Sequence, residues 1–296
     1  MKIRLASAPV SWGIFEFEGM EPRYRWAQVL DEIAETGYVG TELGPYGYLP
    51  TDPNQLRAEL DRRGLKLLSA FVPVDLVDPS AHQAGVETAL RVGRLLAALE
   101  APVLVLADNN GRVPELVKTA GRRSGCFLQD WTHLAGGVEL VRRRVAEELG
   151  LTTVFHHHCA GHVETAQEVE ALLEHSQVQL CLDTGHWHYA GGDAVECLKR
   201  WGSRVGYVHL KDCHPEVAQR CRQAGLDYFA AVQAGLFCPL GEGEVDFPGI
   251  LAELARQGYE GWAVVEQDVL VEDLEAPRRF SQQNREYLQS IGLVKE

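Results

Sequence analysis

The chain has 296 residues, and 42 aspartates and glutamates outnumber 28 lysines and arginines, which gives a formal net charge of −14 at pH 7. Hydrophobic residues make up 46% of the chain and charged residues 24%, as in ordinary globular proteins. This composition excludes a disordered chain, a collagen-like repeat and a coiled coil. The negative charge opposes attachment to phosphate backbones and anionic lipid, so we expect neither a nucleic-acid nor a membrane partner.

The cysteine pattern and the N-terminal residues bear on the cellular compartment. The seven cysteines are an odd number and form no C-x-x-C pair, which argues against a disulfide framework or a zinc ribbon. Residues 1–10 lack the long apolar stretch and cleavage motif of a signal peptide. The longest apolar runs, such as residues 101–107, are too short to span a bilayer. We therefore expect a cytoplasmic protein.

A short apolar run, a turn and an amphipathic stretch recur along the whole chain. In chain order this pattern predicts strand 3–10, helix 23–36, strand 38–43, helix 52–63, strand 65–74, helix 79–100, strand 102–107, helix 128–149, strand 152–156, helix 164–175, strand 179–183, helix 194–201, strand 205–210, helix 247–257, strand 262–266 and helix 276–290. Several strands are apolar throughout, as expected for parallel strands buried on both faces.

Strands and helices that alternate evenly over this length, without a linker, predict a (β/α)8 TIM barrel that forms a single domain over residues 1–296. A doubly wound open sheet is the alternative, and it would show a glycine-rich fingerprint after its first strand. Residues 11–16 read SWGIFE instead, which favours the barrel. Segments 111–125 and 213–243 are too long for simple turns, and we expect them over one mouth of the barrel.

Catalytic residues of such barrels lie at the C-terminal ends of the strands. The polar or aromatic candidates there are Trp12, Glu42, Asp108, His156, His157, His158, Asp183, His186, His209, Lys211, Asp212, Glu266 and Asp268. Because residues two apart in a strand share a face, His156 and His158 are expected to point inward and His157 outward. Imidazole and carboxylate groups are the usual ligands of borderline divalent ions. One strand-five histidine, with the candidates Asp183, His209 and Glu266, therefore predicts a metal site.

Each candidate also has a structural explanation. A lone acidic residue at a strand end often caps a helix or joins a loop salt bridge, and Trp12 can line a pocket or close the barrel. The cysteines fit small buried apolar positions. Three adjacent histidines in an apolar strand are harder to explain structurally, because a buried imidazole without partners is costly.

Several motifs together resemble the xylose isomerase-like barrel superfamily of sugar isomerases and epimerases. They are APVSWG at 8–13, CLDTGH at 181–186, VHLKD at 208–212, LGEGEVDF at 240–247, GYEGW at 258–262 and VEQD at 265–268. The resemblance covers essentially the whole chain. It implies a divalent ion (manganese, cobalt, magnesium or zinc) with Asp183, His209 and Glu266 as ligands, completed by His156 or His158. It also implies that His186 contacts the substrate.

One departure from the superfamily bears on the reaction. Many of its isomerases and epimerases have a glutamate as the strand-five ligand, whereas this chain has histidines at 156–158. We therefore expect an enzyme that eliminates water from a polyhydroxylated ketone, with a small polyol or sugar as substrate. Glu266 or His156 would serve as the base and His186 or Lys211 as the acid. The expected substrate-binding residues are Trp12, Glu42, Asp108, His186 and Lys211.

Three alternatives remain. A ketose isomerase or epimerase would use the same metal and a similar enolate. A repair nuclease on this barrel needs further histidines on strands three and four, but residues 70–73 read AFVP and residues 106–108 read LAD. A sugar-binding scaffold on an inactivated barrel is disfavoured by the complete ligand set. Barrels of this superfamily often form dimers or tetramers, so a homo-oligomer is also expected.

Overall fold

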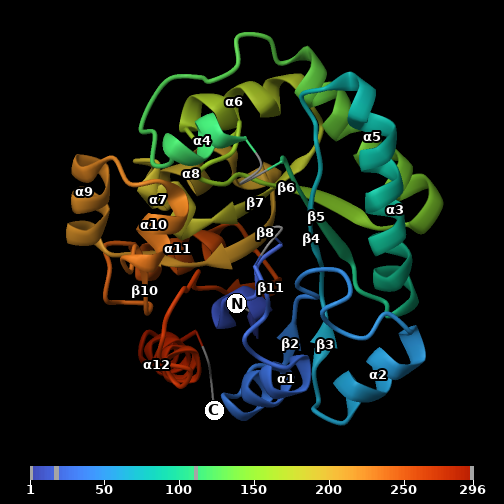
Figure 1. Cartoon of the computed structure of the whole chain (residues 1–296), viewed down its shortest axis with the longest axis vertical. Helices are drawn as coiled ribbons and strands as arrows, with labels where there is room; N and C mark the ends of the chain where they lie inside the picture. The colour runs from blue at the N-terminus through green and yellow to red at the C-terminus, as the bar shows by residue number, and fades with distance from the viewer. Residues whose placement is uncertain (1–2, 17–19, 110–112, 294–296) are drawn as a thin grey trace.

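The computed structural model describes residues 3–16, 20–109 and 113–293, and it shows parallel strands surrounded by helices (Figure 1). The sheet has nine strands in the order β3-β2-β1-β11-β8-β7-β6-β5-β4. Its strands are β1 Ile3–Ser7, β2 Gly40–Thr41, β3 Lys66–Leu67, β4 Phe71–Pro73, β5 Val103–Ala107, β6 Thr152–His156, β7 Gln179–Asp183, β8 Val205–Leu210 and β11 Gly261–Val265. Every neighbouring pair within this sheet is parallel.

The sheet closes into a barrel through the third predicted strand. Residues 65–74 were predicted as one strand, but they form β3 and β4, which are the two ends of the sheet order. Between them, the Leu68 amide donates to the Thr41 carbonyl (3.0 Å), and the Leu68 carbonyl accepts from the Val103 amide (3.3 Å). The same stretch of chain therefore pairs with both neighbours, and the predicted TIM barrel is confirmed.

All eight predicted helices are present; 194–201 and 276–290 have the predicted bounds, and the other six differ at one or both ends. They are α1 Trp26–Glu35, α2 Pro53–Asp61, α3 His82–Ala98, α5 Thr132–Leu149, α6 Ala166–His175, α8 Ala194–Trp201, α11 Phe247–Arg256 and α12 Ala276–Ser290. Local capping explains some boundaries. Thr165 and Glu168 form a capping box that starts α6, and Asp52 caps α2 by accepting from the Gln55 amide.

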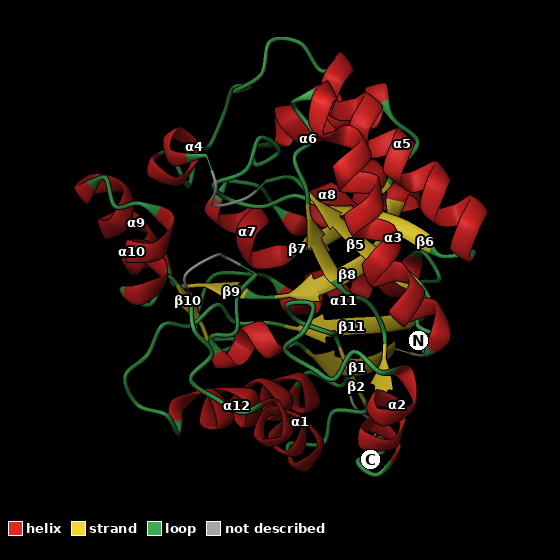
Figure 2. Cartoon of the chain, turned by 45° about the vertical axis from the view of Figure 1, so that its right-hand side comes forward, coloured by secondary structure: helices red, strands yellow, loops and turns green. Residues whose placement is uncertain are grey.

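Two segments add structure at one side of the barrel. Residues 213–243 contain α9 Pro215–Ala224, α10 Tyr228–Gln233 and β10 Phe237–Cys238, which pairs antiparallel with β9 Asp212–Cys213. Helix α4 Pro114–Lys118 lies within the predicted segment 111–125, of which residues 111 and 112 lie outside the described residues. Figure 2 shows α4, α9 and α10 together on one side of the strands, beside α7 Thr184–Tyr189. The strand arrows point toward this side.

The alternation of side chains along the strands separates two apolar layers. One cluster includes Val105, Val154, Cys181, Tyr207 and Val264 and fills the barrel. The residues that alternate with these belong to the larger cluster between sheet and helices: Leu104, Leu106, Phe155, Leu180, Leu182, Val208, Ala263 and Val265. With a period of two, the inward positions that follow Val154, Cys181, Tyr207 and Val264 are the polar residues His156, Asp183, His209 and Glu266, which form the base of the site described below.

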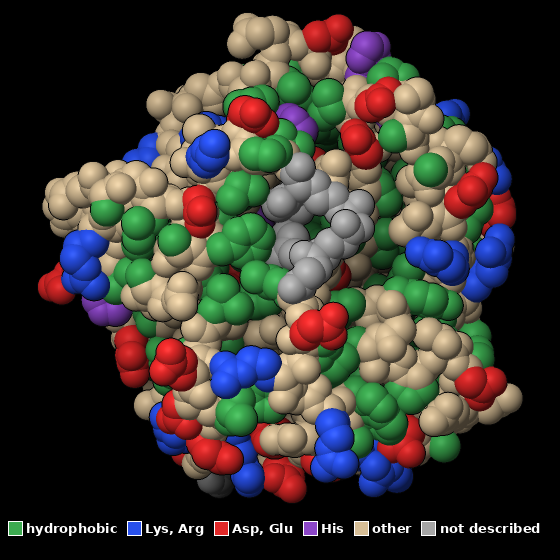
Figure 3. Space-filling view, viewed as in Figure 1, with side chains coloured by type: hydrophobic (Ala, Val, Ile, Leu, Met, Phe, Trp, Pro, Cys, Tyr) green, Lys and Arg blue, Asp and Glu red, His purple; other side chains and the backbone are tan. Residues whose placement is uncertain are grey.

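No helix within the described ranges is long and apolar enough to cross a membrane. On the face seen in Figure 3, acidic and basic side chains are interspersed and lie mainly toward the rim, while hydrophobic side chains gather nearer the centre.

Asp212 ties the loop before α11 to the end of β8. Its side chain is fully buried and accepts from four backbone amides, those of Cys213 (2.8 Å), Gly241 (2.8 Å), Gly243 (3.0 Å) and Val245 (3.1 Å). A Cβ added at Gly243 would lie 2.1 Å from Asp212 Oδ1, so only glycine allows this close approach. These bonds join residues 241–245 to Asp212, which follows Lys211, and so fix the chain at the end of β8.

Replacement of Asp212 should therefore destabilise the protein strongly. We expect Asp212→Ala to lower the free energy of unfolding by about 3 kcal/mol, because buried amides lose a charged acceptor. The matched control is Asp193→Ala, in which an exposed cap that accepts from Val195 and Glu196 is lost, with an expected loss of about 1 kcal/mol. Urea denaturation followed by circular dichroism measures both. Equal losses in the two variants would contradict the role given to Asp212.

Candidate active site

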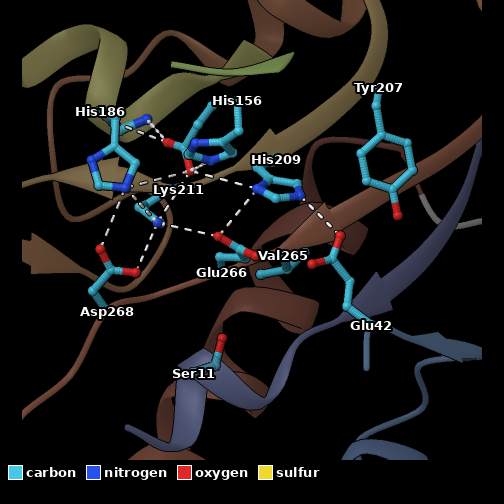
Figure 4. Close-up of polar contacts among 12 residues, drawn as sticks. Ser11, Glu42, His156, His186, Tyr207, His209, Lys211, Val265, Glu266 and Asp268 are labelled. Atoms are coloured by element: carbon cyan, nitrogen blue, oxygen red, sulfur yellow. Dashed lines mark hydrogen bonds and ion pairs between the residues drawn. The ribbon is translucent and has the colours of Figure 1, made fainter. Parts of the chain in front are cut away.

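Four polar side chains converge above the apolar filling of the barrel (Figure 4). His156 ends β6, Asp183 ends β7, His209 lies in β8 and Glu266 follows β11, so each comes from a neighbouring strand. One donor atom from each lies within 4.8 Å of the others, and all four residues are buried. His209 Nδ1 is 3.2 Å from Glu266 Oε2 and 3.8 Å from Asp183 Oδ2, which is in turn 3.5 Å from His156 Nε2. We call these residues the four-residue cluster.

The hydrogen bonds of the four-residue cluster leave some of its potential metal-ligand atoms directed at its centre. Asp183 Oδ1 accepts from the amides of Gly185 and His186 (2.9 Å each) and so caps α7. His209 Nε2 pairs with Glu42 Oε1 at 3.0 Å. Among the described residues, Asp183 Oδ2 and His209 Nδ1 make no hydrogen bond, although Asp183 Oδ2 contacts the Lys211 ammonium and His209 Nδ1 contacts the Glu266 carboxylate. Two imidazoles and two carboxylates with inward-facing atoms fit a borderline divalent cation, and a carboxylate behind a ligating histidine is the usual support for one.

Lys211 supplies the positive charge of the site. Its ammonium lies 2.8 Å from Asp268 Oδ1, 3.1 Å from Asp183 Oδ2, 3.2 Å from Glu266 Oε2 and 3.1 Å from His186 Nε2. Although burial favours the neutral amine, these carboxylates hold the pKa of Lys211 well above its ordinary value. The site therefore contains a buried lysine that stays protonated.

The charges of the site also set the ionisation of the four-residue cluster. Burial alone would raise the pKa of Glu266, but His209 and Lys211 lower it to about 2. Burial opposes an imidazolium at His209, yet Cys181, Glu266 and Glu42 hold its pKa well above the ordinary value. Glu266 is thus an ionised carboxylate, available as a ligand or a proton acceptor.

The three strand-five histidines occupy different environments. His156 and His158 line the pocket, as predicted from the strand alternation, and His157 does not. His157 Nε2 accepts from the Asp183 amide (3.2 Å), and its ring packs edge-on against Trp187. His158 lies outside the four-residue cluster, with its ring 3.9 Å from that of His186. The geometry thus offers His156 as the strand-five ligand.

Two of the expected substrate-binding residues lie elsewhere. Trp12 ends the 3-10 helix η1 (Pro9–Trp12), which begins where the first strand was predicted to continue, and its indole donates to Glu32 (2.6 Å). Asp108 is buried and pairs with His162 through the backbone amide (2.6 Å) and Nδ1 (3.0 Å). Neither lines the pocket, whereas Glu42, His186 and Lys211 do.

The pocket also contains Phe15, Glu16 and Tyr228, which were not predicted as site residues from the sequence, and Asp268, which was a strand-end candidate without an assigned role. Tyr228 in α10 donates to Asp268 Oδ2 (2.8 Å). Burial, with nearby Glu266 and Glu42, raises the pKa of Glu16 well above its ordinary value. Asp268 was indicated by its place just after a predicted strand, whereas Glu16 lies in an irregular segment and Tyr228 begins the short helix α10 within the long segment 213–243.

The barrel with a histidine and carboxylate cluster at the carboxyl ends of its strands defines the class of protein. Residues 30–291 match the family model described as xylose isomerase-like TIM barrel, and the chain belongs to this family.

Individual proteins are also similar to this chain. An inosose dehydratase from Geobacillus kaustophilus is 34% identical over 300 residues, which cover 97% of this chain and 94% of that protein. Among solved structures, the probable 3-DHS dehydratase AsbF from Bacillus anthracis superposes with a TM-score of 0.70 at 14% identity, covering 98% of this chain and 99% of that one. The 3-keto-D-glucoside 4-epimerase YcjR from E. coli has a TM-score of 0.66 at 16% identity, with 99% and 100% covered. At these identities the two structures show the fold alone.

The first prediction for the site concerns metal content. We expect the purified protein to bind about one divalent ion per chain, because four preorganised donors act together. Asp183→Asn keeps an oxygen that caps α7 but removes the charge at Oδ2, so it should lose the ion, as should His209→Ala and Glu266→Ala. Asp108→Asn, a buried aspartate outside the pocket, should keep it. Elemental analysis after dialysis measures the content, and full occupancy in Asp183→Asn, His209→Ala and Glu266→Ala would refute the assignment.

A second prediction separates the strand-five histidines. His156→Ala should lose the ion, whereas His157→Ala should retain it and lower the free energy of unfolding by about 1–2 kcal/mol, since the Asp183 amide loses its acceptor. Metal analysis and urea denaturation of both variants decide the question. The face assignment is wrong if His157→Ala loses the ion while His156→Ala keeps it.

Proposed function

We propose that this protein is a metal-dependent dehydratase that removes water from a polyhydroxylated ketone such as 2-keto-myo-inositol. The near full-length similarity to an inosose dehydratase supports the reaction class. The observation that carries the proposal is that the pocket contains groups of different kinds. The Glu266 carboxylate lines it together with the imidazole of His156 and the ammonium of Lys211. An elimination needs one base and one acid, and this arrangement provides both.

His156, Asp183, His209 and Glu266 would hold the divalent ion. When bound there, the ion supplies a Lewis acid that stabilises negative charge on the ketone oxygen. Glu42 orients His209 by pairing with Nε2, which leaves Nδ1 directed at the centre of the four-residue cluster.

The proton transfers are assigned to groups whose charge state suits them. Glu266, held ionised by His209 and Lys211, accepts the α-proton of the ketone. The electron pair of that C–H bond forms the carbon–carbon double bond, and the β C–O bond breaks. Lys211 protonates the departing oxygen, so that water leaves and the product is the enol of a diketone.

The charges of the pocket also indicate the substrate class. Glu42, Glu266 and Asp268 line it, and Lys211 is the only lysine or arginine among its described lining residues. Carboxylates accept hydrogen bonds from hydroxyl groups, but they repel a phosphate. This composition supports a neutral polyol ketone over a sugar phosphate.

An epimerase is the second candidate function. A 3-keto-D-glucoside 4-epimerase has a similar fold. Epimerisation and dehydration both begin with removal of a proton next to a carbonyl. An epimerase returns a proton to the opposite face of the same carbon, whereas a dehydratase expels the β-hydroxyl.

The discriminating experiment follows absorbance with 2-keto-myo-inositol and manganese or cobalt. We expect a rise in near-ultraviolet absorbance, because elimination creates a conjugated product and epimerisation does not. Lys211→Met should lower the rate roughly 10²–10⁴-fold, the usual contribution of a general acid, whereas His188→Ala, a part-exposed histidine outside this pocket, should leave it unchanged. A flat trace with the wild-type protein, together with conversion of a ketose to its epimer, would favour the epimerase.

A further inference from the structure

A buried thiol lies behind the active site and contacts a histidine of the pocket. Cys159 Sγ is 2.9 Å from His186 Nδ1, and both side chains are buried. The other ring nitrogen of His186, Nε2, faces Lys211 Nζ at 3.1 Å. His186 therefore connects a residue that does not line the pocket to the ammonium ion assigned above as the acid.

The chemistry of the two contacts fixes the position of the imidazole proton. An ammonium group has only donors, so His186 Nε2 must accept from Lys211 with its lone pair. A neutral imidazole has one proton, which then resides on Nδ1 and is donated to the sulfur of Cys159. His158, Cys159 and His186 also lie within 4.8 Å of one another, but a proton on Nδ1 makes this contact a hydrogen bond and leaves no lone pair there for a metal ion.

The surroundings of Nε2 favour the opposite tautomer. Asp268 Oδ2 lies 3.5 Å from Nε2 and Asp183 Oδ2 lies 4.0 Å from it, and both carboxylates would attract a proton there. The ring itself is confined, since it packs against His158 at 3.9 Å and edge-on against Phe237 at 5.0 Å. Tautomer choice is thus decided by hydrogen-bond partners rather than by movement of the ring.

The turn after β6 holds Cys159 in place for this contact. The His158 amide donates to the Val163 carbonyl, and the Gly161 amide donates to the His158 carbonyl, each at 3.0 Å. Between these bonds Ala160 has φ 67°, a left-handed conformation that costs a non-glycine residue about 1–2 kcal/mol. The closed turn fixes the backbone that carries this thiol, whose sulfur contacts His186.

We infer that Cys159 is a positioning residue that keeps the proton of His186 on Nδ1, so that Nε2 accepts from Lys211 and holds its ammonium toward the substrate. Without the sulfur acceptor, the proton moves to Nε2 and is donated to Asp268, and Lys211 loses one of its partners. The tautomer follows from the contacts alone, whereas its effect on turnover rests on the proposed dehydration.

Nitrogen-15 NMR of the histidine side chains tests the tautomer directly. The full-length protein would be loaded with Mg²⁺ or Zn²⁺, which are diamagnetic, and His186 assigned by comparison with His186→Gln. We expect the Nδ1–H tautomer in the wild type, the Nε2–H tautomer in Cys159→Ala and retention of Nδ1–H in Cys159→Ser, where the hydroxyl can accept. Cys213→Ala is the matched control, because this buried cysteine belongs to the same apolar cluster as Cys159.

Kinetics with 2-keto-myo-inositol provide the second readout. Cys159→Ala should lower kcat roughly 10–100-fold, as loss of an orienting partner behind a site usually does, with KM little changed, partial recovery in Cys159→Ser and no change in Cys213→Ala. An Nε2–H tautomer in the wild type, or an unchanged tautomer in Cys159→Ala, would overturn the inference. Absence of dehydration in the wild type would instead refute the proposed function, and the NMR result would still decide the tautomer.

Discussion

Charge balance in a buried pocket is the constraint on which the rest of this structure depends. Asp183, Glu266 and Asp268 place carboxylates around one point of low dielectric, where unpaired charges are expensive. Lys211 offsets part of this charge through contacts of 2.8–3.2 Å with all three. In the part of the chain that the structure describes, Asp183 Oδ2 and His209 Nδ1 make no hydrogen bond. These two atoms mark where a divalent cation would offset the remaining negative charge. The same arrangement that makes the pocket costly to fold keeps one carboxylate ionised and one ammonium charged.

The inward-facing side chains of the strands that carry the site are apolar along most of the strand and polar at its carboxyl end. Within β6, β7 and β8 the inward residues Val154, Cys181 and Tyr207 fill the barrel, and the inward position two residues later is His156, Asp183 or His209 in each case. The helices pack on the alternate residues of the same strands. Because the polar ends rest on a close-packed apolar layer, the donor atoms are held without contribution from flexible segments.

Sequence periodicity predicted the parts of the site that lie on regular strands. Strands 152–156, 179–183 and 205–210 have the predicted bounds, and their alternation correctly separated His156 from His157. Periodicity gave the wrong structure where the chain leaves the strand. Pro9 begins a 3-10 helix in place of the predicted strand, and the Trp12 indole at its end donates to Glu32. Asp108 follows β5, and a partner 54 positions away, His162, takes its carboxylate. Such long-range pairings, like the positions of Glu16 in an irregular segment and of Tyr228 in the short helix α10, leave no local signal in a single sequence.

The interrupted third strand has a consequence for how the barrel opens. Between β3 and β4 the sheet is joined through a few backbone bonds around Leu68, whereas β5 to β8 are paired over longer ladders. Local opening of a protein starts where cooperative hydrogen bonding is weakest. The barrel therefore has a weakly bonded seam at Leu68, and we expect local opening to begin in this short-ladder part of the sheet. Of the strands that carry the site, β8, which holds His209, lies across the barrel from that seam.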